Sequence, residues 1–106
     1  MPRDILVLAE HSAGKIDSLS SQLLAIGHRL AAQMKVELVA AVIGHRMDNI
    51  VEALQGNGID RILVVDDPGL PLASAEVQAQ VFAELARQAA PRLVLIGYSL
   101  VGMELT

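Results

Sequence analysis

Four short runs of aliphatic residues are spaced along the chain and predict four buried strands. They cover residues 4–9, 36–43, 61–65 and 92–97. Each run is nearly continuous in Val, Leu, Ile and Ala and does not alternate with polar residues. This pattern is typical of a strand that is covered on both faces, as in a parallel sheet.

Helical periods lie between these runs. In the first, aliphatic residues recur at steps of three and four, and Asp17 or Ser18 is placed to cap the helix. The predicted buried stripe of this helix consists of Leu19, Leu23, Ile26, Leu30 and Met34.

Two further helices are predicted. The shorter one is closed by Gly56-Asn57-Gly58 and carries the apolar residues Met47, Ile50, Val51 and Leu54. The longer one has Ser74 as a candidate cap and Pro91 as its stop. Its predicted stripe is Val77, Val81, Leu85 and Ala89.

The alternation of strands and helices predicts a single α/β domain with a parallel sheet and right-handed crossovers. We expect a doubly wound, Rossmann-like three-layer sandwich with strand order 3-2-1-4. In this order two helices share one face and only the third covers the other. Because a sheet this apolar does not leave much of a face in water, either a partner covers that face or the natural chain continues beyond Thr106, and we expect continuation.

Composition narrows the functional classes. The 106 residues are 53% hydrophobic and only 2% aromatic, and their net charge is −4. Few aromatic residues and no basic surplus argue against nucleic-acid binding. With no cysteine, a disulfide scaffold, a zinc–thiolate site and a thiol nucleophile are excluded.

No apolar run approaches the ~18 residues of a membrane span, and no secretory signal or transit peptide is seen. We therefore expect a cytoplasmic protein, or a mitochondrial matrix protein if the source is eukaryotic.

The best candidate site is the point where the strand order reverses, beyond the carboxyl ends of the first and fourth strands. The candidate residues of this crevice are Glu10, His11, Ser99 and Gly102. Glu10 and His11 fit either an acid/base pair or ribose contacts, but a polar loop with a hydrogen-bonded histidine is the favoured interpretation. Neither Ser12 nor Ser99 has the G-x-S-x-G surroundings of a nucleophile, so no catalytic residues are assigned.

Other polar residues have simpler interpretations. His28 is expected to be solvated and His45 is isolated, so no metal site is predicted. Asp66-Asp67-Pro68 fits Mg²⁺ binding, but turn chemistry at a strand exit is favoured. Gly14-Lys15 is interpreted as a turn, and residues 97–102 could form a weak anion-binding nest.

Several local patterns, taken together and in order, resemble the N-terminal domain of electron transfer flavoprotein alpha subunits of the FixB type. Residues 5–11, followed by Gly14-Lys15-Ile16, are similar to the opening strand and loop of that family. Residues 59–68 are similar to its third strand and exit. Residues 91–97, followed by Gly102-Met103-Glu104-Leu105, are similar to its fourth strand and the turn into the next helix.

This resemblance implies an adenine-nucleotide-hydrolase-like fold and an electron carrier, not an enzyme by itself. It implies a heterodimer with a beta subunit that passes electrons from flavin dehydrogenases, such as acyl-CoA dehydrogenases, to a quinone reductase. In this family FAD is held mainly by a C-terminal domain. Residues 1–106 are then a fragment without that domain, and we expect no flavin on this chain alone.

The sequence leaves two alternative functions. The first is a free-standing nucleotide-binding module of the universal-stress type, with Glu10, His11, Ser99 and Gly102 as candidate contacts. The second is an independent hydrolase, which lacks a nucleophile–base pair.

Overall fold

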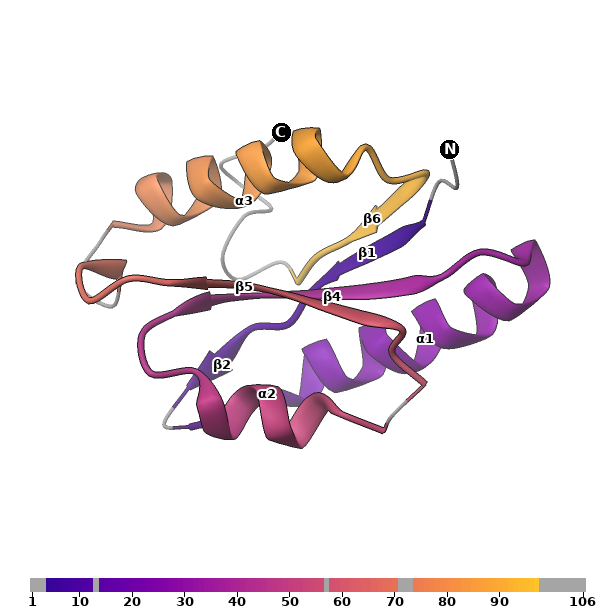
Figure 1. Cartoon of the computed structure of the whole chain (residues 1–106), viewed down its shortest axis with the longest axis horizontal. Coiled ribbons are helices and arrows are strands. Elements are labelled where there is room, and N and C mark those ends of the chain that lie inside the picture. Colours follow the sequence, from indigo (N-terminus) through magenta and orange to yellow (C-terminus); the bar gives the residue numbers. More distant parts are fainter. Residues whose placement is uncertain (1–3, 13, 57, 71–73, 98–106) are drawn as a thin grey trace.

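Four parallel strands form the central sheet in the order β5-β4-β1-β6 (Figure 1). The computed structural model describes residues 4–12, 14–56, 58–70 and 74–97. The strands are β1 (Ile5–Leu8), β4 (Leu38–Gly44), β5 (Arg61–Asp66) and β6 (Leu93–Leu95). If the four strands of this sheet are counted in chain order, the order β5-β4-β1-β6 is 3-2-1-4. All three pairings are parallel. The predicted topology is confirmed.

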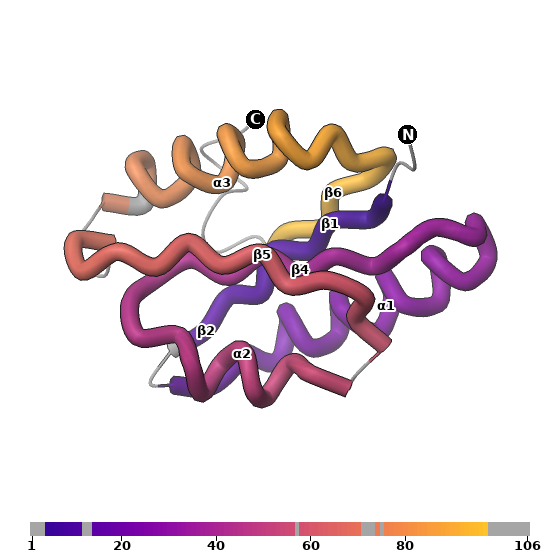
Figure 2. The backbone as a smooth tube through the Cα atoms, viewed as in Figure 1, coloured from indigo at the N-terminus to yellow at the C-terminus, as the bar shows by residue number. Residues whose placement is uncertain are grey.

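Helices cover the sheet on both sides and make three layers. The helices α1 (Ser18–Met34) and α2 (Asp48–Leu54) lie on one face, and α3 (Ala75–Ala89) lies on the other (Figures 1 and 2). Within the described residues, no helix combines the length and the apolar character needed to cross a bilayer.

The two central strands carry the core. Every residue of β1 and β4 is buried, and their side chains point alternately into two apolar clusters, one under α1 and α2 and one under α3. The outer strands differ, because β6 is half-buried along its length and β5 has three half-buried and three exposed residues. The aliphatic runs of the sequence are thus fully buried only in the middle of the sheet.

The predicted helix caps are confirmed. The Asp17 carboxylate accepts the backbone N–H of Ser20 at 2.7 Å, and the Ser74 hydroxyl accepts that of Val77 at 3.2 Å. After α2 the chain turns with Gly56 at φ +80°, a conformation that glycine adopts without strain. Asn57 lies outside the described residues.

The buried face of α1 differs from the predicted stripe. Leu19 and Ile26 are 41% and 38% exposed, and the residues buried against the sheet are Ser20, Leu24, Gly27 and Ala31. These are mostly small, and they let the helix lie close to the strands. A Cβ at Gly27 would come within 2.9 Å of a methyl carbon of Leu38, and the buried Ser20 hydroxyl accepts the Glu10 N–H at 2.8 Å.

The stripe predicted for α3 is also partly wrong. Val77 is 44% exposed, whereas Ala79 and Phe82 are buried. Phe82 fills the space between α3 and the sheet, and this large ring sets which side of the helix faces inward.

A small antiparallel ribbon stands where the sequence predicts only a turn. Its strands are β2 (His11–Ser12) and β3 (Lys15–Ile16). Gly14 lies between them at φ +76°, so the turn itself is confirmed. The ribbon joins the end of β1 to the start of α1.

Candidate functional site

The ends of β1 and β6 meet at the predicted reversal point of the sheet. Glu10 follows β1, and its buried Oε2 atom lies against Gly97, which follows β6. A Cβ on residue 97 would overlap that carboxylate oxygen. The main chain of Glu10 is fixed by two hydrogen bonds, because its N–H donates to Ser20 and its carbonyl accepts the Asp17 N–H at 2.9 Å.

His11 lies on the other side, beside β4. Its Nε2 atom is 3.0 Å from the Ile43 carbonyl and donates to it, and its ring packs on Gly44, where a Cβ would come within 3.1 Å of Cε1. The side chains of Glu10 and His11 therefore contact different strands and do not form an acid/base pair. Ser99 and Gly102 lie outside the described residues, as does the side chain of Ser12.

The cavity at this edge is small, about 220 Å³. It is lined by Leu8, Ala9, Glu10, His11, Ile43 and Gln78. Pockets for drug-sized ligands are usually ~300–1,000 Å³, and the Glu10 carboxylate would repel a phosphate placed there. Among the described lining residues, no lysine or arginine balances that charge. The described residues of this crevice therefore do not fit a dinucleotide such as FAD.

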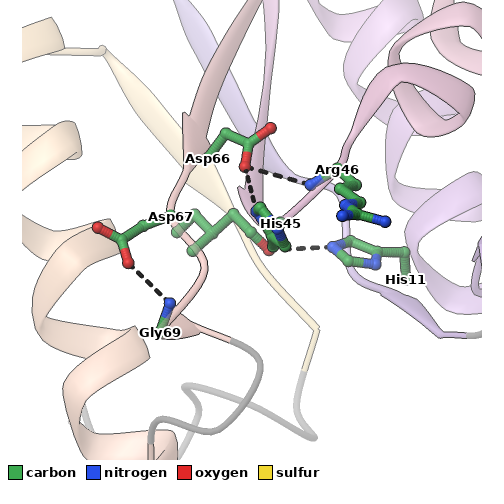
Figure 3. A network of polar contacts seen from close by, with 7 residues as sticks. His11, His45, Arg46, Asp66, Asp67 and Gly69 are labelled. Atoms are coloured by element: carbon green, nitrogen blue, oxygen red, sulfur yellow. Dashed lines mark hydrogen bonds and ion pairs between the residues drawn. The ribbon is translucent and has the colours of Figure 1, made fainter.

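A second polar cluster forms where β4 and β5 end (Figure 3). The Nδ1 atom of His45 donates to the Asp66 carboxylate at 3.0 Å, and the Arg46 N–H donates to the same oxygen at 3.1 Å. The neighbouring Asp67 accepts the Gly69 N–H at 2.8 Å in a turn, as predicted for this strand exit.

The pairing of His45 with Asp66 is not among the predictions made from the sequence. The sequence pattern could have predicted this pair, because both residues follow consecutive aliphatic runs that are predicted to pair in parallel. In the structure, Gly44 is in register with Asp66. The hydrogen bond from His45 lowers the pKa of Asp66, and the N–H groups of Arg46 and Met47 act in the same direction. Within the described residues, no group of three His, Cys, Asp or Glu side chains could hold a metal ion.

A larger cavity, about 840 Å³, lies at the opposite, amino-terminal edge of the sheet. Its acidic side chains contact neighbouring strands. The buried Asp4 carboxylate accepts hydrogen bonds from Arg61 at 2.8 Å and from the Glu37 N–H at 3.3 Å, and Asp60 accepts the Leu38 N–H at 2.8 Å. These contacts account for the acidic residues there, and we assign no ligand to this edge.

Comparison with known proteins identifies the family. A family model described as electron transfer flavoprotein domain matches residues 5–106. The chain belongs to the electron transfer flavoprotein domain family. The chain is of the alpha type and corresponds to the N-terminal domain of that subunit, as the resemblance implied.

Three relatives show the extent of the similarity. An electron transfer flavoprotein subunit alpha of Thermoanaerobacterium thermosaccharolyticum is 32% identical over 97% of this chain, and that of Bacillus subtilis is 26% identical over 100%. The acryloyl-CoA reductase electron transfer subunit beta of Anaerotignum propionicum is 31% identical over 97%. The chain spans only 31%, 32% and 28% of these proteins, respectively.

The contact between Glu10 and Gly97 can be tested with a double-mutant cycle. We expect Gly97→Ala to destabilise the fold by about 1–3 kcal/mol, because the added methyl group overlaps the buried carboxylate. In a Glu10→Ala background the same substitution should cost clearly less. Urea unfolding of the four proteins measures both costs, and equal costs in the two backgrounds would contradict the described contact.

The His45–Asp66 pair predicts a pH dependence. The pKa of Asp66 is lowered by the His45 hydrogen bond, so the pair contributes stability above the unfolded-state pKa of Asp66 and loses it as the pH falls through the folded-state value. We expect His45→Ala to raise the pKa of Asp66 toward its ordinary value, as measured by NMR titration of the side-chain carboxyl. Glu84, whose pKa is lowered by Arg87 on α3, is the internal control. The pKa of Glu84 should be the same in the wild type and in His45→Ala.

Proposed function

We propose that this chain is the N-terminal α/β domain of an alpha-type electron transfer flavoprotein subunit, and that its work is to scaffold an alpha/beta heterodimer. In the complete protein, electrons would pass from flavin dehydrogenases, such as acyl-CoA dehydrogenases, to a quinone reductase. The FAD that carries them would be held outside residues 1–106. The observation that carries this proposal is a family match over almost the whole chain, and it is supported by a crevice whose described residues do not fit a dinucleotide.

The lengths and names of the relatives support a larger assembly. The chain spans 28–32% of the three relatives, which leaves room in a protein of that length for a separate flavin-binding domain. Their names describe electron transfer subunits, one of them belonging to a reductase, which favours a carrier over a catalyst for this chain.

A groove on the α3 face, which the described residues leave open, supports the proposal of further chain in the complete protein. The groove, about 560 Å³, runs between α3 and β6 and is lined mainly by Phe82, Ala83, Ala86, Pro91, Val94 and Ile96. A strand added beyond β6 would be reached by a right-handed crossover, whose helix lies on the α3 face. We propose that such a helix fills this groove.

Flavin analysis tests the proposal. The purified 106-residue chain should show no flavin absorbance, and its acid-denatured supernatant should contain no nucleotide. A full-length subunit co-purified with a beta-type subunit should carry FAD. Stoichiometric FAD on the short chain would contradict the proposal, and bound AMP or ATP would favour the free-standing nucleotide-binding module.

A further inference from the structure

The turn between β4 and α2 contains a backbone conformation that no helix end explains. Among the described residues other than glycine, three have a positive φ: Lys35, Arg46 and Ala90. Lys35 and Ala90 end the helices α1 and α3, where a left-handed residue is common, and their N–H groups donate to carbonyls of the preceding helical turn. Arg46, at φ +56°, follows a strand instead. A residue with a side chain keeps this conformation only where its surroundings fix it.

The Asp66 carboxylate at the end of β5 fixes this turn. One of its oxygens accepts the Arg46 N–H at 3.1 Å and the His45 Nδ1–H at 3.0 Å (Figure 3). The N–H of Met47 is hydrogen-bonded to the same carboxylate. Three consecutive residues of the turn are therefore held by one side chain that lies about 20 positions further along the chain.

The helix that follows this turn is short and weakly anchored at its start. α2 has 7 residues, whereas α1 has 17 and α3 has 15, and a helix of one or two turns is not stable by itself. Its N-cap residue, Met47, makes no side-chain capping bond, unlike the N-cap residues of α1 and α3. The helix is held on the core by the buried side chains of Met47, Ile50 and Leu54.

Both ends of this helix lie beside turns of unusual backbone conformation. The strained turn at Arg46 precedes it, and Gly56 and Gly58 follow it at φ +80° and +77°. We call residues 45–56 the α2 segment. Glycine changes its backbone angles at little cost, so the second turn allows the α2 segment to move relative to β5.

Like charges oppose the contact between the α2 segment and β5. Asp48 and Glu52 of α2 line the same cavity as Asp66, about 570 Å³ in volume. Three carboxylates around one cavity repel one another, and the hydrogen bonds that Asp66 accepts from residues 45–47 act against this repulsion. The closed position of α2 is thus a balance between these bonds and the apolar burial on one side, and charge repulsion and the strain at Arg46 on the other.

We propose that the Asp66 carboxylate holds the α2 segment against β5, and that this segment opens as a unit while the sheet stays folded. Opening breaks the bonds to Asp66 and releases Arg46 from its left-handed conformation. It also exposes apolar side chains to water, which keeps the closed form dominant. The ring of His11 packs on Gly44, directly before the α2 segment, so opening reaches the reversal point of the sheet. This inference does not depend on the proposed function.

Hydrogen–deuterium exchange of the full-length subunit, followed by mass spectrometry, tests the opening. The amides to follow are those of residues 51–55, because the N–H groups of Val51 and Gln55 are bonded within α2. In the wild type we expect them to exchange faster than the amides of β1 and β4. Their exchange should also depend little on added urea, because a local opening exposes little surface.

Two neighbouring carboxylates give a matched pair of variants. Asp66→Ala removes the acceptor of the turn and should speed exchange of residues 51–55 by roughly 10-fold or more, because bonds to a charged acceptor are lost. Asp67→Ala removes the adjacent carboxylate, which accepts the Gly69 N–H in a different turn, and should not speed it. If Asp66→Ala does not fold, Asp66→Asn keeps one acceptor oxygen and should give a smaller change in the same direction.

The role of the strained residue has its own variant. Arg46→Gly removes the strain at positive φ, so it should slow exchange of residues 51–55 and offset part of the acceleration caused by Asp66→Ala. Arg46→Ala removes the same side chain but keeps the strain, and it should not slow exchange.

Two results would overturn the inference. Residues 51–55 that exchange as slowly as β1 and β4, with the same urea dependence, would mean that α2 opens only when the whole domain unfolds. Equal effects of Asp66→Ala and Asp67→Ala would mean that Asp66 does not hold the α2 segment.

Discussion

The structure depends on two adjacent strands, β1 and β4, that are apolar on both faces. All eleven of their residues are buried, so both faces of the sheet need cover. The helices α1 and α2 supply it on one side and α3 on the other. These helices and the two strands form the hydrophobic core. On the α3 face of the sheet, however, α3 is the only described helix. The groove beside β6, which the described residues leave open, follows from the same constraint.

Because the middle of the sheet is filled with aliphatic side chains, polar groups are confined to its two edges. At the amino-terminal edge, Asp4 joins the starts of neighbouring strands through Arg61 and the main chain. At the carboxyl edge, His45 and Asp66 lock β4 to β5, while Glu10 fills the space beside Gly97. Many of the carboxylates and histidines that the sequence analysis considered as functional residues therefore contact the ends of neighbouring strands. This arrangement favours a domain whose function lies in its outer surfaces.

Much of the fold could be predicted from the sequence, because strand order and helix caps depend on local pattern and on the handedness of crossovers. The direction in which each helix faces could not. Aliphatic spacing marks Leu19 and Ile26 as core, but close packing at Gly27 and the buried hydroxyl of Ser20 turn α1 toward its small residues. Periodicity does not register a glycine or serine as buried. The crevice was located by topology alone, whereas the divergence of Glu10 and His11 and the pairing of His45 with Asp66 depend on contacts between strands distant in sequence.

The central claim is that residues 1–106 take part in assembly with a beta-type subunit and hold no flavin of their own. Sedimentation of the 106-residue chain, alone and mixed with a purified beta-type subunit, tests this claim most directly. Our account predicts that the mixture sediments as a complex of the two chains. Two independently sedimenting species in the mixture would contradict it.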